Sequence, residues 1–205
     1  RNLSLREWTE PLTHELKIHE IVTGSSGRVY LVREGAECDS AAVYHYKNRV
    51  FNETEWLLQA WEDFETDPER EAFFLRRFQA SLNSIMLVAF DGADVIGTIT
   101  LLGGPYRRTQ HVASLGLGVI QSWWSNGVGT RLLELGLEWA RNNPLLSKVN
   151  LQVYHTNERA ITLYERYGFK REGCLKRDVR LDDGTEVDLV LMSLYLDGES
   201  AGENT

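Results

Sequence analysis

The spacing of apolar residues changes period along the chain, and each period predicts a kind of element. Apolar and polar residues that alternate are typical of strands, whereas apolar residues three and four positions apart are typical of helices. Glycine, proline and asparagine mark the boundaries between these segments. The strands predicted in this way are part of 13–22, then 29–32, 85–90, 95–102, 111–120, 149–154, 169–181 and 186–196.

Helices are predicted between these strands, and several begin at capping residues. Asp39 or Ser40 can cap a helix that runs to about Val50, and Thr54 can cap a second short one. A third begins at Asp67-Pro68, with proline at its first position. The face of this third helix predicted to be buried consists of Phe73, Phe74, Phe78 and Leu82. The last two predicted helices are 128–140 and 157–167.

The order of these elements predicts an α/β fold. A strand, several helices, three strands, a helix, a strand, a helix and two strands fit a mixed sheet with helices on both faces. The hairpin signals Asp91-Gly92 and Asp182-Asp183-Gly184 connect neighbouring strands of this sheet. We therefore expect an N-terminal appendage at 1–27, one compact domain at 28–197 and a polar tail at 198–205.

Composition and charge exclude several classes of protein. The 205 residues are 42% hydrophobic and 25% charged, as in ordinary globular proteins, and the net charge of −8 argues against a protein that binds nucleic-acid phosphates. No apolar run approaches the ~20 residues that cross a membrane. Cys38 and Cys174 are too few for a disulfide framework, no histidine stands at metal-ligand spacing, and the first residues lack the apolar core of a signal peptide. A cytoplasmic protein without a metal is the simplest expectation.

The first chemical signal lies where the strand 111–120 leads into the helix 128–140. Between them, 124–130 has the sequence Trp-Ser-Asn-Gly-Val-Gly-Thr, and the first turn of a helix carries unpaired backbone N–H groups at the positive end of its dipole. Gly127 and Gly129 remove side chains that would keep a ligand away from those groups. Such a turn suits a pyrophosphate, although a plain connection between strand and helix would have the same pattern.

The second signal is the segment 157–169, which follows a predicted strand. Asn157 stands where a helix cap would stand, and Tyr164 lies two turns later on the same face of the helix. The segment ends in Gly168-Phe169, with glycine at the position that closes a helix. By spacing alone, Tyr164 can equally be a half-buried core tyrosine.

In this order, the two segments resemble the GNAT superfamily of N-acetyltransferases. Gly127-Val128-Gly129-Thr130 is similar to the loop that binds the pyrophosphate of acetyl-coenzyme A, and 157–169 is similar to the family pattern Asn-x-x-Ala, Tyr, Gly-Phe. The similarity extends over roughly Val29–Leu196. One position departs from the family pattern, because Trp124 stands where the family usually has Gln or Arg.

The resemblance implies a GNAT-like acyltransferase fold, in which the mixed central sheet is mostly antiparallel with helices on both faces. It also implies an enzyme that moves the acetyl group of acetyl-coenzyme A to a primary amine of a small molecule or protein, by direct attack in a ternary complex. A non-catalytic module that senses acyl-coenzyme A is the alternative, and Trp124 and Ser114 keep it open. The expected partner is the amine acceptor, with neither nucleic acid nor membrane, and the terminal strands can pair across a homodimer.

The resemblance also assigns roles to residues. By it, the backbone N–H of Val119 serves the pantetheine arm or the thioester oxygen, Asn157 binds that arm directly or through water, and Tyr164 is the candidate acid that protonates the leaving thiolate. Gly116 and Gly118 fit a bulged strand at this point. The residues expected to bind the coenzyme are Leu117, Val119, Trp124, Ser125, Asn126, Gly127, Val128, Gly129, Thr130, Asn157 and Tyr164.

The general base stays open. A protonated nitrogen has no free electron pair for attack, and the position where many relatives carry a basic Glu is Ser114 here. Glu53 is the first candidate, because it and its neighbours resemble a Glu-Thr segment near the acceptor pocket of relatives, although a solvated acid at a helix start explains it too. His111 is the second candidate, with a structural histidine as its alternative. Trp56 and Trp61 either line the acceptor pocket or pack in the core.

Overall fold

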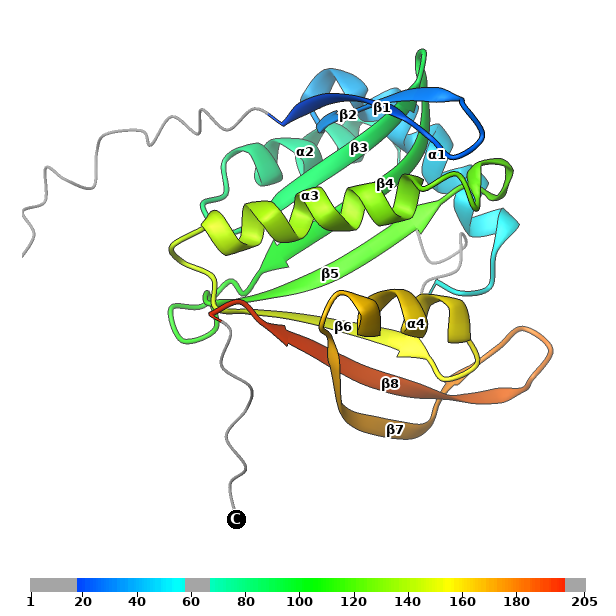
Figure 1. Cartoon of the computed structure of the whole chain (residues 1–205), viewed down its shortest axis with the longest axis vertical. Coiled ribbons are helices and arrows are strands. Elements are labelled where there is room, and N and C mark those ends of the chain that lie inside the picture. Colours follow the sequence, from blue (N-terminus) through cyan, green and yellow to red (C-terminus); the bar gives the residue numbers. More distant parts are fainter. Residues whose placement is uncertain (1–17, 58–66, 198–205) are drawn as a thin grey trace, which may run out of the picture.

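Within residues 18–57 and 67–197, which the computed structural model describes, all strands belong to one sheet (Figure 1). The strands follow one another in the order β1-β2-β3-β4-β5-β6-β8-β7. Their bounds are β1 (His19–Thr23), β2 (Val29–Glu34), β3 (Ile85–Asp91), β4 (Asp94–Gly103), β5 (Val112–Val119), β6 (Lys148–Tyr154), β7 (Lys170–Arg180) and β8 (Glu186–Tyr195). The helices are α1 (Ser40–Glu53), α2 (Pro68–Gln79), α3 (Val128–Asn142) and α4 (Glu158–Arg166), and the short 3-10 turns are η2 (Glu37–Asp39) and η4 (Gln121–Trp123). In the described residues, no helix is long and apolar enough to span a membrane.

The sheet is mixed, as predicted. Each neighbouring pair of described strands is antiparallel except β5 and β6, which are parallel. In Figure 1, α3 and α4 lie in front of the sheet, while α1 and α2 lie behind it. Strand β4 contacts both layers: Ile99 packs against α3 at Gly136, whereas the Thr98 hydroxyl donates to the Tyr46 hydroxyl of α1 at 3.3 Å. The predicted α/β fold with helices on both faces is thereby confirmed.

Strand β1 extends the sheet at one edge. The strand expected within 13–22 is present from His19 onward, and it pairs antiparallel with β2 as far as Thr23. The turn between the two strands contains Gly27 at a φ of 82°, a left-handed conformation that suits glycine. The part of the predicted appendage from residue 18 onward therefore joins the sheet through β1 and its turn.

Some predictions fall on residues outside the described part. They concern 13–17, the short helix after Thr54, Trp61 and the tail from 198. Thr54 itself is the residue at which α1 ends, and its hydroxyl accepts the backbone N–H of Trp56 at 3.2 Å. Residues 55–57, the described residues directly after Thr54, are not helical.

Two predicted capping residues differ in what they bind. The Asp67 carboxylate accepts the backbone N–H of Arg70 at 2.8 Å, and Pro68 is the first residue of α2, as predicted. Asp39 precedes α1, but its side chain makes no cap there. Its carboxylate instead accepts two hydrogen bonds from the Arg33 guanidinium, at 2.6 and 2.7 Å. This bidentate ion pair joins β2 to the start of α1.

The buried face predicted for α2 is wrong at two positions. Phe73 is 57% exposed, and Leu82 is 47% exposed and lies beyond the end of the helix. Phe78 is buried as predicted, and the other buried residues of α2 are Glu71 and Leu75. Glu71 is buried because Lys47 of α1 donates to both of its carboxylate oxygens, each at 2.8 Å. A buried acid of this kind leaves no mark in the spacing of apolar residues.

Candidate active site

The edge of β5 that faces β6 is open over much of its length. Among the described residues, the two strands pair only over Val112–Ser114 of β5, and beyond this range they diverge (Figure 1). The backbone N–H of Ile120 donates to a carbonyl of β4 at 3.0 Å, and N–H groups alternate between the two edges of a strand. The N–H groups of Leu117 and Val119 therefore point away from β4, into the opening between β5 and β6.

The bulge predicted at Gly116 and Gly118 is wrong, because β4 and β5 stay in register along the whole of β5. The two glycines instead make room for hydroxyl groups on the α1 side of the sheet. A Cβ atom at Gly118 would lie 2.7 Å from the Tyr46 hydroxyl oxygen, and one at Gly116 would lie 2.9 Å from the Thr100 hydroxyl oxygen. The strand is thus open at its edge without being irregular.

The turn that follows β5 exposes a row of backbone N–H groups. Gly127 is the N-cap of α3 and has no side-chain cap, and both Gly127 and Ser125 have positive φ, at 82° and 61°. From Ser125 onward, the first backbone N–H with an acceptor among the described residues is that of Arg131, which donates to the Gly127 carbonyl at 2.9 Å. The N–H groups of 125–130 are therefore available to a ligand, at the positive end of the α3 dipole. An anion such as a pyrophosphate fits this arrangement.

Trp124 makes two contacts beside this turn. Its indole N–H donates to the Val119 carbonyl at 2.7 Å, which ties the turn to the end of β5. The guanidinium carbon of Arg159, in the first turn of α4, lies 5.5 Å from the centre of a Trp124 ring. A cation thus stands near the turn although position 124 carries no Arg. Arg159 is absent from the predicted site, and its one sequence signal is a cation in a first helical turn, where the helix dipole disfavours it.

Asn157 precedes the first residue of α4, and Tyr164 lies in the last turn of this helix. The Asn157 side-chain oxygen accepts the backbone N–H of Ala160 at 3.1 Å, which caps the helix as its position predicts. Tyr164 is buried, and its ring packs against Phe169 with the ring centres 5.6 Å apart. Burial raises the pKa of Tyr164 to about 12, so the phenol is protonated at neutral pH and can donate a hydrogen bond.

Glu53 lies at the end of α1, beside the same turn. One of its carboxylate oxygens accepts the Arg49 side chain at 2.6 Å, and the other accepts the backbone N–H of Gln121 at 2.7 Å. Burial of the carboxyl opposes its ionisation, but the hydrogen bonds from Arg49 and Gln121 outweigh burial and hold the pKa of Glu53 below its ordinary value. A carboxylate in this state is a weak proton acceptor and a good anchor for the turn.

The other residues considered for the acceptor side are His111, Ser114 and Trp56. His111 is exposed and directly precedes β5, at the end of the strand opposite the turn. Ser114 is exposed and is the last residue of β5 that pairs with β6. Trp56 packs edge-on against Tyr154 of β6, with the ring centres 6.3 Å apart. In the described residues, no group of three or more His, Cys, Asp or Glu side chains is arranged to hold a metal ion.

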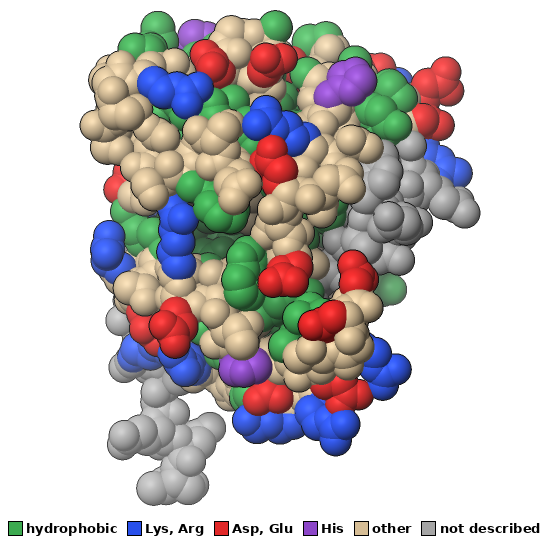
Figure 2. All heavy atoms as spheres, turned by 90° about the vertical axis from the view of Figure 1, so that its right-hand side faces the viewer, with side chains coloured by type: hydrophobic (Ala, Val, Ile, Leu, Met, Phe, Trp, Pro, Cys, Tyr) green, Lys and Arg blue, Asp and Glu red, His purple; other side chains and the backbone are tan. Residues whose placement is uncertain are grey.

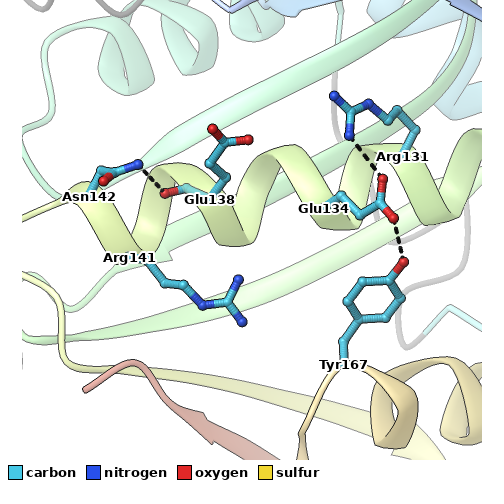
Figure 3. Close-up of a pocket in the computed structure, with 6 residues that line it drawn as sticks. All are labelled: Arg131, Glu134, Glu138, Arg141, Asn142 and Tyr167. Carbon is cyan, nitrogen blue, oxygen red and sulfur yellow. Dashed lines mark hydrogen bonds and ion pairs between the residues drawn. The ribbon is translucent and has the colours of Figure 1, made fainter. Parts of the chain in front are cut away.

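A separate open pocket of about 560 Å³ lies along α3 (Figure 3). Glu134 forms part of its wall by accepting the Arg131 guanidinium at 2.9 Å and the Tyr167 hydroxyl at 2.6 Å, which links α3 to the end of α4. The pocket is lined by Arg131, Glu134, Glu138, Arg141, Asn142 and Tyr167. None of the predicted site residues is among them, so the pocket and the predicted site are different places.

The side of the molecule on which β5 and β6 diverge is shown in Figure 2. This face is hollowed across its middle, and hydrophobic side chains lie in the hollow. Lys and Arg side chains alternate with Asp and Glu around it, so the net charge of −8 is not gathered into one acidic patch on this face. This face therefore does not present a surface of uniform negative charge to an anionic ligand.

An open edge of the central sheet, free N–H groups at the helix that follows it and the α4 segment together define an N-acetyltransferase of the GNAT type. The chain belongs to the acetyltransferase (GNAT) family, whose family model matches residues 51–169. Enzymes of this family use acetyl-coenzyme A as the acetyl donor.

Relatives with known names support this assignment. L-amino acid N-acetyltransferase AaaT of Escherichia coli (strain K12) is 34% identical over 107 residues, which are 52% of this chain and 65% of that relative. The chain thus spans slightly less than two thirds of that relative's length. An aminoglycoside N(6')-acetyltransferase type 1 of Klebsiella pneumoniae is 27% identical over 194 residues, which cover 84% of this chain and 87% of the relative.

Solved structures of the same fold cover most of the chain. A GNAT family acetyltransferase from Streptococcus pneumoniae superposes with a TM-score of 0.77 at 29% identity, covering 81% of this chain and 98% of that structure. The structure of yncA from Salmonella typhimurium, solved with its cofactor acetyl-CoA, superposes with a TM-score of 0.71 at 19% identity, covering 85% of this chain and 98% of that structure. Both comparisons confirm the GNAT fold.

Proposed function

We propose that this protein transfers the acetyl group of acetyl-coenzyme A to a primary amine of a small molecule or protein, by direct attack in a ternary complex. The observation that carries the proposal is the row of N–H groups at 125–130 that have no acceptor among the described residues, next to the open edge of β5. A pyrophosphate held there leaves the pantetheine arm to extend along that edge, toward the N–H groups of Leu117 and Val119. Two relatives are named for acetylation of L-amino acids and aminoglycosides, which favours a small-molecule amine.

In the proposed reaction, the neutral amine nitrogen attacks the thioester carbon, the C–N bond forms and the C–S bond breaks. The nitrogen, positively charged after attack, releases one proton to solvent as the amide forms. The N–H of Val119 is placed to donate to the pantetheine arm or to the carbonyl oxygen as negative charge develops on it. The thiolate leaves with the electron pair of the C–S bond and needs a proton or a hydrogen-bond donor. Tyr164 is our candidate for that donor, and Asn157 for a contact with the pantetheine arm.

The raised pKa of Tyr164 refines its proposed role. A thiol has an ordinary pKa of about 8.5, well below the pKa of about 12 that burial produces at Tyr164, so complete proton transfer from the phenol is uphill. A hydrogen bond from the phenol stabilises the same developing charge without this cost. We therefore assign Tyr164 to stabilising the thiolate in the transition state, before solvent supplies its proton.

The amine must lose a proton before it attacks, and Glu53 is the first candidate for the base that accepts this proton. The two hydrogen bonds that Glu53 accepts favour a role in positioning the turn over a role as this base. If Glu53 only anchors the turn, Glu53→Gln raises KM for acetyl-coenzyme A and leaves the acid limb of the pH profile of kcat in place. If Glu53 is the base, the same variant removes that limb and lowers kcat by about 100-fold or more. His111→Gln, assayed in the same way, tests His111 as the second candidate for the base.

A thiol-release assay over a panel of amines tests the proposed function. The panel contains L-amino acids, an aminoglycoside and a peptide with a free N-terminus, with acetyl-coenzyme A as donor. We expect free thiol to appear only with a productive acceptor, and Tyr164→Phe to lower kcat about 100-fold while the Kd for coenzyme A is unchanged. Tyr167→Phe, at the end of the same helix, is the matched control and keeps kcat.

The contrary result is equally clear. Tight binding of acetyl-coenzyme A with no turnover on any amine would overturn the proposal in favour of a module that senses acyl-coenzyme A. The departures at Trp124 and Ser114 are the features that would then account for the missing activity.

A further inference from the structure

The turn between β1 and β2 lies against the turn that carries the free N–H groups. The Ser25 hydroxyl donates to the Ser125 carbonyl at 2.7 Å, across 100 residues of sequence, and the Ser25 backbone N–H donates to the Asn126 carbonyl at 3.4 Å. A Cβ atom at Gly24 would lie only 2.7 Å from the same Asn126 carbonyl oxygen. The two backbones are therefore in direct contact, at a distance that glycine alone permits.

The β1–β2 hairpin also holds the segments on either side of this contact. The guanidinium of Arg28 stacks on a Trp123 ring, 3.5 Å from its centre, and donates to the Ser122 carbonyl at 3.3 Å. At the other side, Glu20 of β1 accepts two hydrogen bonds from Arg131 in the first turn of α3, at 3.0 and 2.5 Å. The hairpin thus contacts η4, which precedes the turn, and α3, which follows it.

These contacts determine where the N–H groups of the turn point. In a planar trans peptide, the carbonyl and the following N–H point in opposite directions. Because the Ser125 carbonyl points toward Ser25, the N–H of Asn126 points away from the hairpin. The Asn126 carbonyl also points toward Ser25, so the N–H of Gly127 points away from the hairpin as well. Ser125 keeps a φ of 61°, which non-glycine residues adopt at a cost unless their surroundings hold them there.

We infer that the β1–β2 hairpin is a brace that orients the N–H groups of Asn126 and Gly127 toward the pyrophosphate, with Ser25 as its positioning residue. The inference rests on the proposed function, because the pyrophosphate is that of acetyl-coenzyme A. Without the Ser25 hydroxyl, Ser125 relaxes toward negative φ and the adjacent N–H groups turn away from the ligand. The effect falls on coenzyme binding and not on the chemical step.

Calorimetric titration of the full chain with coenzyme A tests the brace. We expect Ser25→Ala to raise the Kd about three- to tenfold, as the loss of one oriented hydrogen bond predicts. Ser26→Ala is the matched control, since Ser26 lies in the same turn and has no hydrogen bond to a described residue, and it leaves the Kd unchanged. Ser25→Thr retains the hydroxyl and restores binding. With a productive amine, Ser25→Ala raises KM for acetyl-coenzyme A and keeps kcat.

A second variant, Gly24→Ala, distinguishes a loss of the brace from a loss of folding. Gly24→Ala pushes the hairpin off the Asn126 carbonyl while keeping the Ser25 hydroxyl, and we expect a rise in Kd with a thermal unfolding midpoint close to that of the wild type. A wild-type chain that does not bind coenzyme A overturns the proposed function and the brace together. Wild-type binding that neither Ser25→Ala nor Gly24→Ala weakens overturns the brace alone.

Discussion

Gly127 and Gly129 stand in the same turn, but only Gly127 needs the conformational freedom of glycine. Gly127 has a φ of 82°, a region that residues with a side chain adopt only under strain. A Cβ atom at Gly129 would meet its nearest neighbours at 3.6 and 3.9 Å, which is ordinary contact. A substitution at Gly127 therefore tests the effect of backbone strain, whereas a substitution at Gly129 tests the effect of adding a side chain near the ligand.

We predict that Gly127→Ala lowers the free energy of unfolding by about 1–2 kcal/mol and weakens coenzyme A binding about tenfold, because the strained turn relaxes and its N–H groups move. Gly129→Ala keeps the affinity and stabilises the start of α3 by up to about 1 kcal/mol. Urea unfolding and calorimetric titration measure both quantities. Equal losses of affinity in the two variants would contradict a role for the left-handed backbone.

Arg159 lies 5.5 Å from a ring of Trp124, which occupies the position where the family usually has Arg or Gln. We predict that Arg159→Gln raises the Kd for coenzyme A about three- to fivefold at low salt, because an exposed cation near the phosphates is lost. The difference from the wild type shrinks as salt is added, since added ions screen the interaction. Arg166→Gln, at the far end of α4, is the control. An effect of the same size in Arg166→Gln would attribute the change to net charge alone.

At the scale of elements, β5 has two edges with different partners. Its edge toward β4 is paired throughout, whereas its edge toward β6 is unpaired beyond Ser114 among the described residues. Glu53 and Trp124 then fix the segments after β5, one through the Gln121 N–H and the other through the Val119 carbonyl. The open edge is thus held in place by contacts beyond its end, without being closed.

Hydrogen exchange can detect this asymmetry within one strand. We predict that the amides of Leu117 and Val119 exchange about 100-fold or more faster than those of Gly116 and Gly118, whose N–H groups face β4. Saturation with coenzyme A slows the first pair and leaves the second nearly unchanged, as amide-resolved exchange would show. Uniform protection along β5 in the free protein would contradict an open edge.

At the scale of the whole molecule, the sheet has a seam. Strands β1 to β5 and strands β6 to β8 meet in the described residues through one short parallel ladder of β5 and β6. Hydrogen bonds also cross from one part to the other, such as that of the Tyr167 hydroxyl to Glu134 of α3. A ligand that contacts both β5 and α4 adds contacts across this seam, and so stabilises the two parts against separation.

We predict that coenzyme A at about 100 times its Kd raises the thermal unfolding midpoint by about 5–11 °C. Binding at that ratio adds about 2.7 kcal/mol, and each kcal/mol shifts the midpoint of a chain of this size by about 2–4 °C. Differential scanning calorimetry at several ligand concentrations measures the shift. The same concentration of coenzyme A raises the unfolding midpoint of Gly127→Ala by a smaller amount, because this variant binds coenzyme A more weakly. An unchanged midpoint at that concentration would contradict preferential binding of coenzyme A to the folded chain.

Elements that depend on near neighbours in sequence were predicted well. The start of α2 at Asp67-Pro68 and the cap of α4 at Asn157 follow from groups within three residues of one another. The buried face of α2 was predicted wrongly because the partner of Glu71 is Lys47, on another helix. The bulge in β5 was predicted wrongly because the reason for Gly118 is a hydroxyl group of α1. Neither partner can be inferred from local spacing.

The α/β class, a glycine-containing turn after β5 and the resemblance to the family could be predicted from the sequence, because periodicity, caps and glycine-rich turns depend on residues a few positions apart. The surroundings of that turn depend on segments that are distant in sequence and are brought together by the fold. The turn is contacted from three elements: by Ser25 of the β1–β2 turn, by Arg159 of α4 and by Glu53 of α1. The pKa of Glu53 is lowered by hydrogen-bond donors that the fold brings to its carboxylate. The physical reason is that hydrogen bonds and charges act over a few ångströms, whatever the distance along the chain.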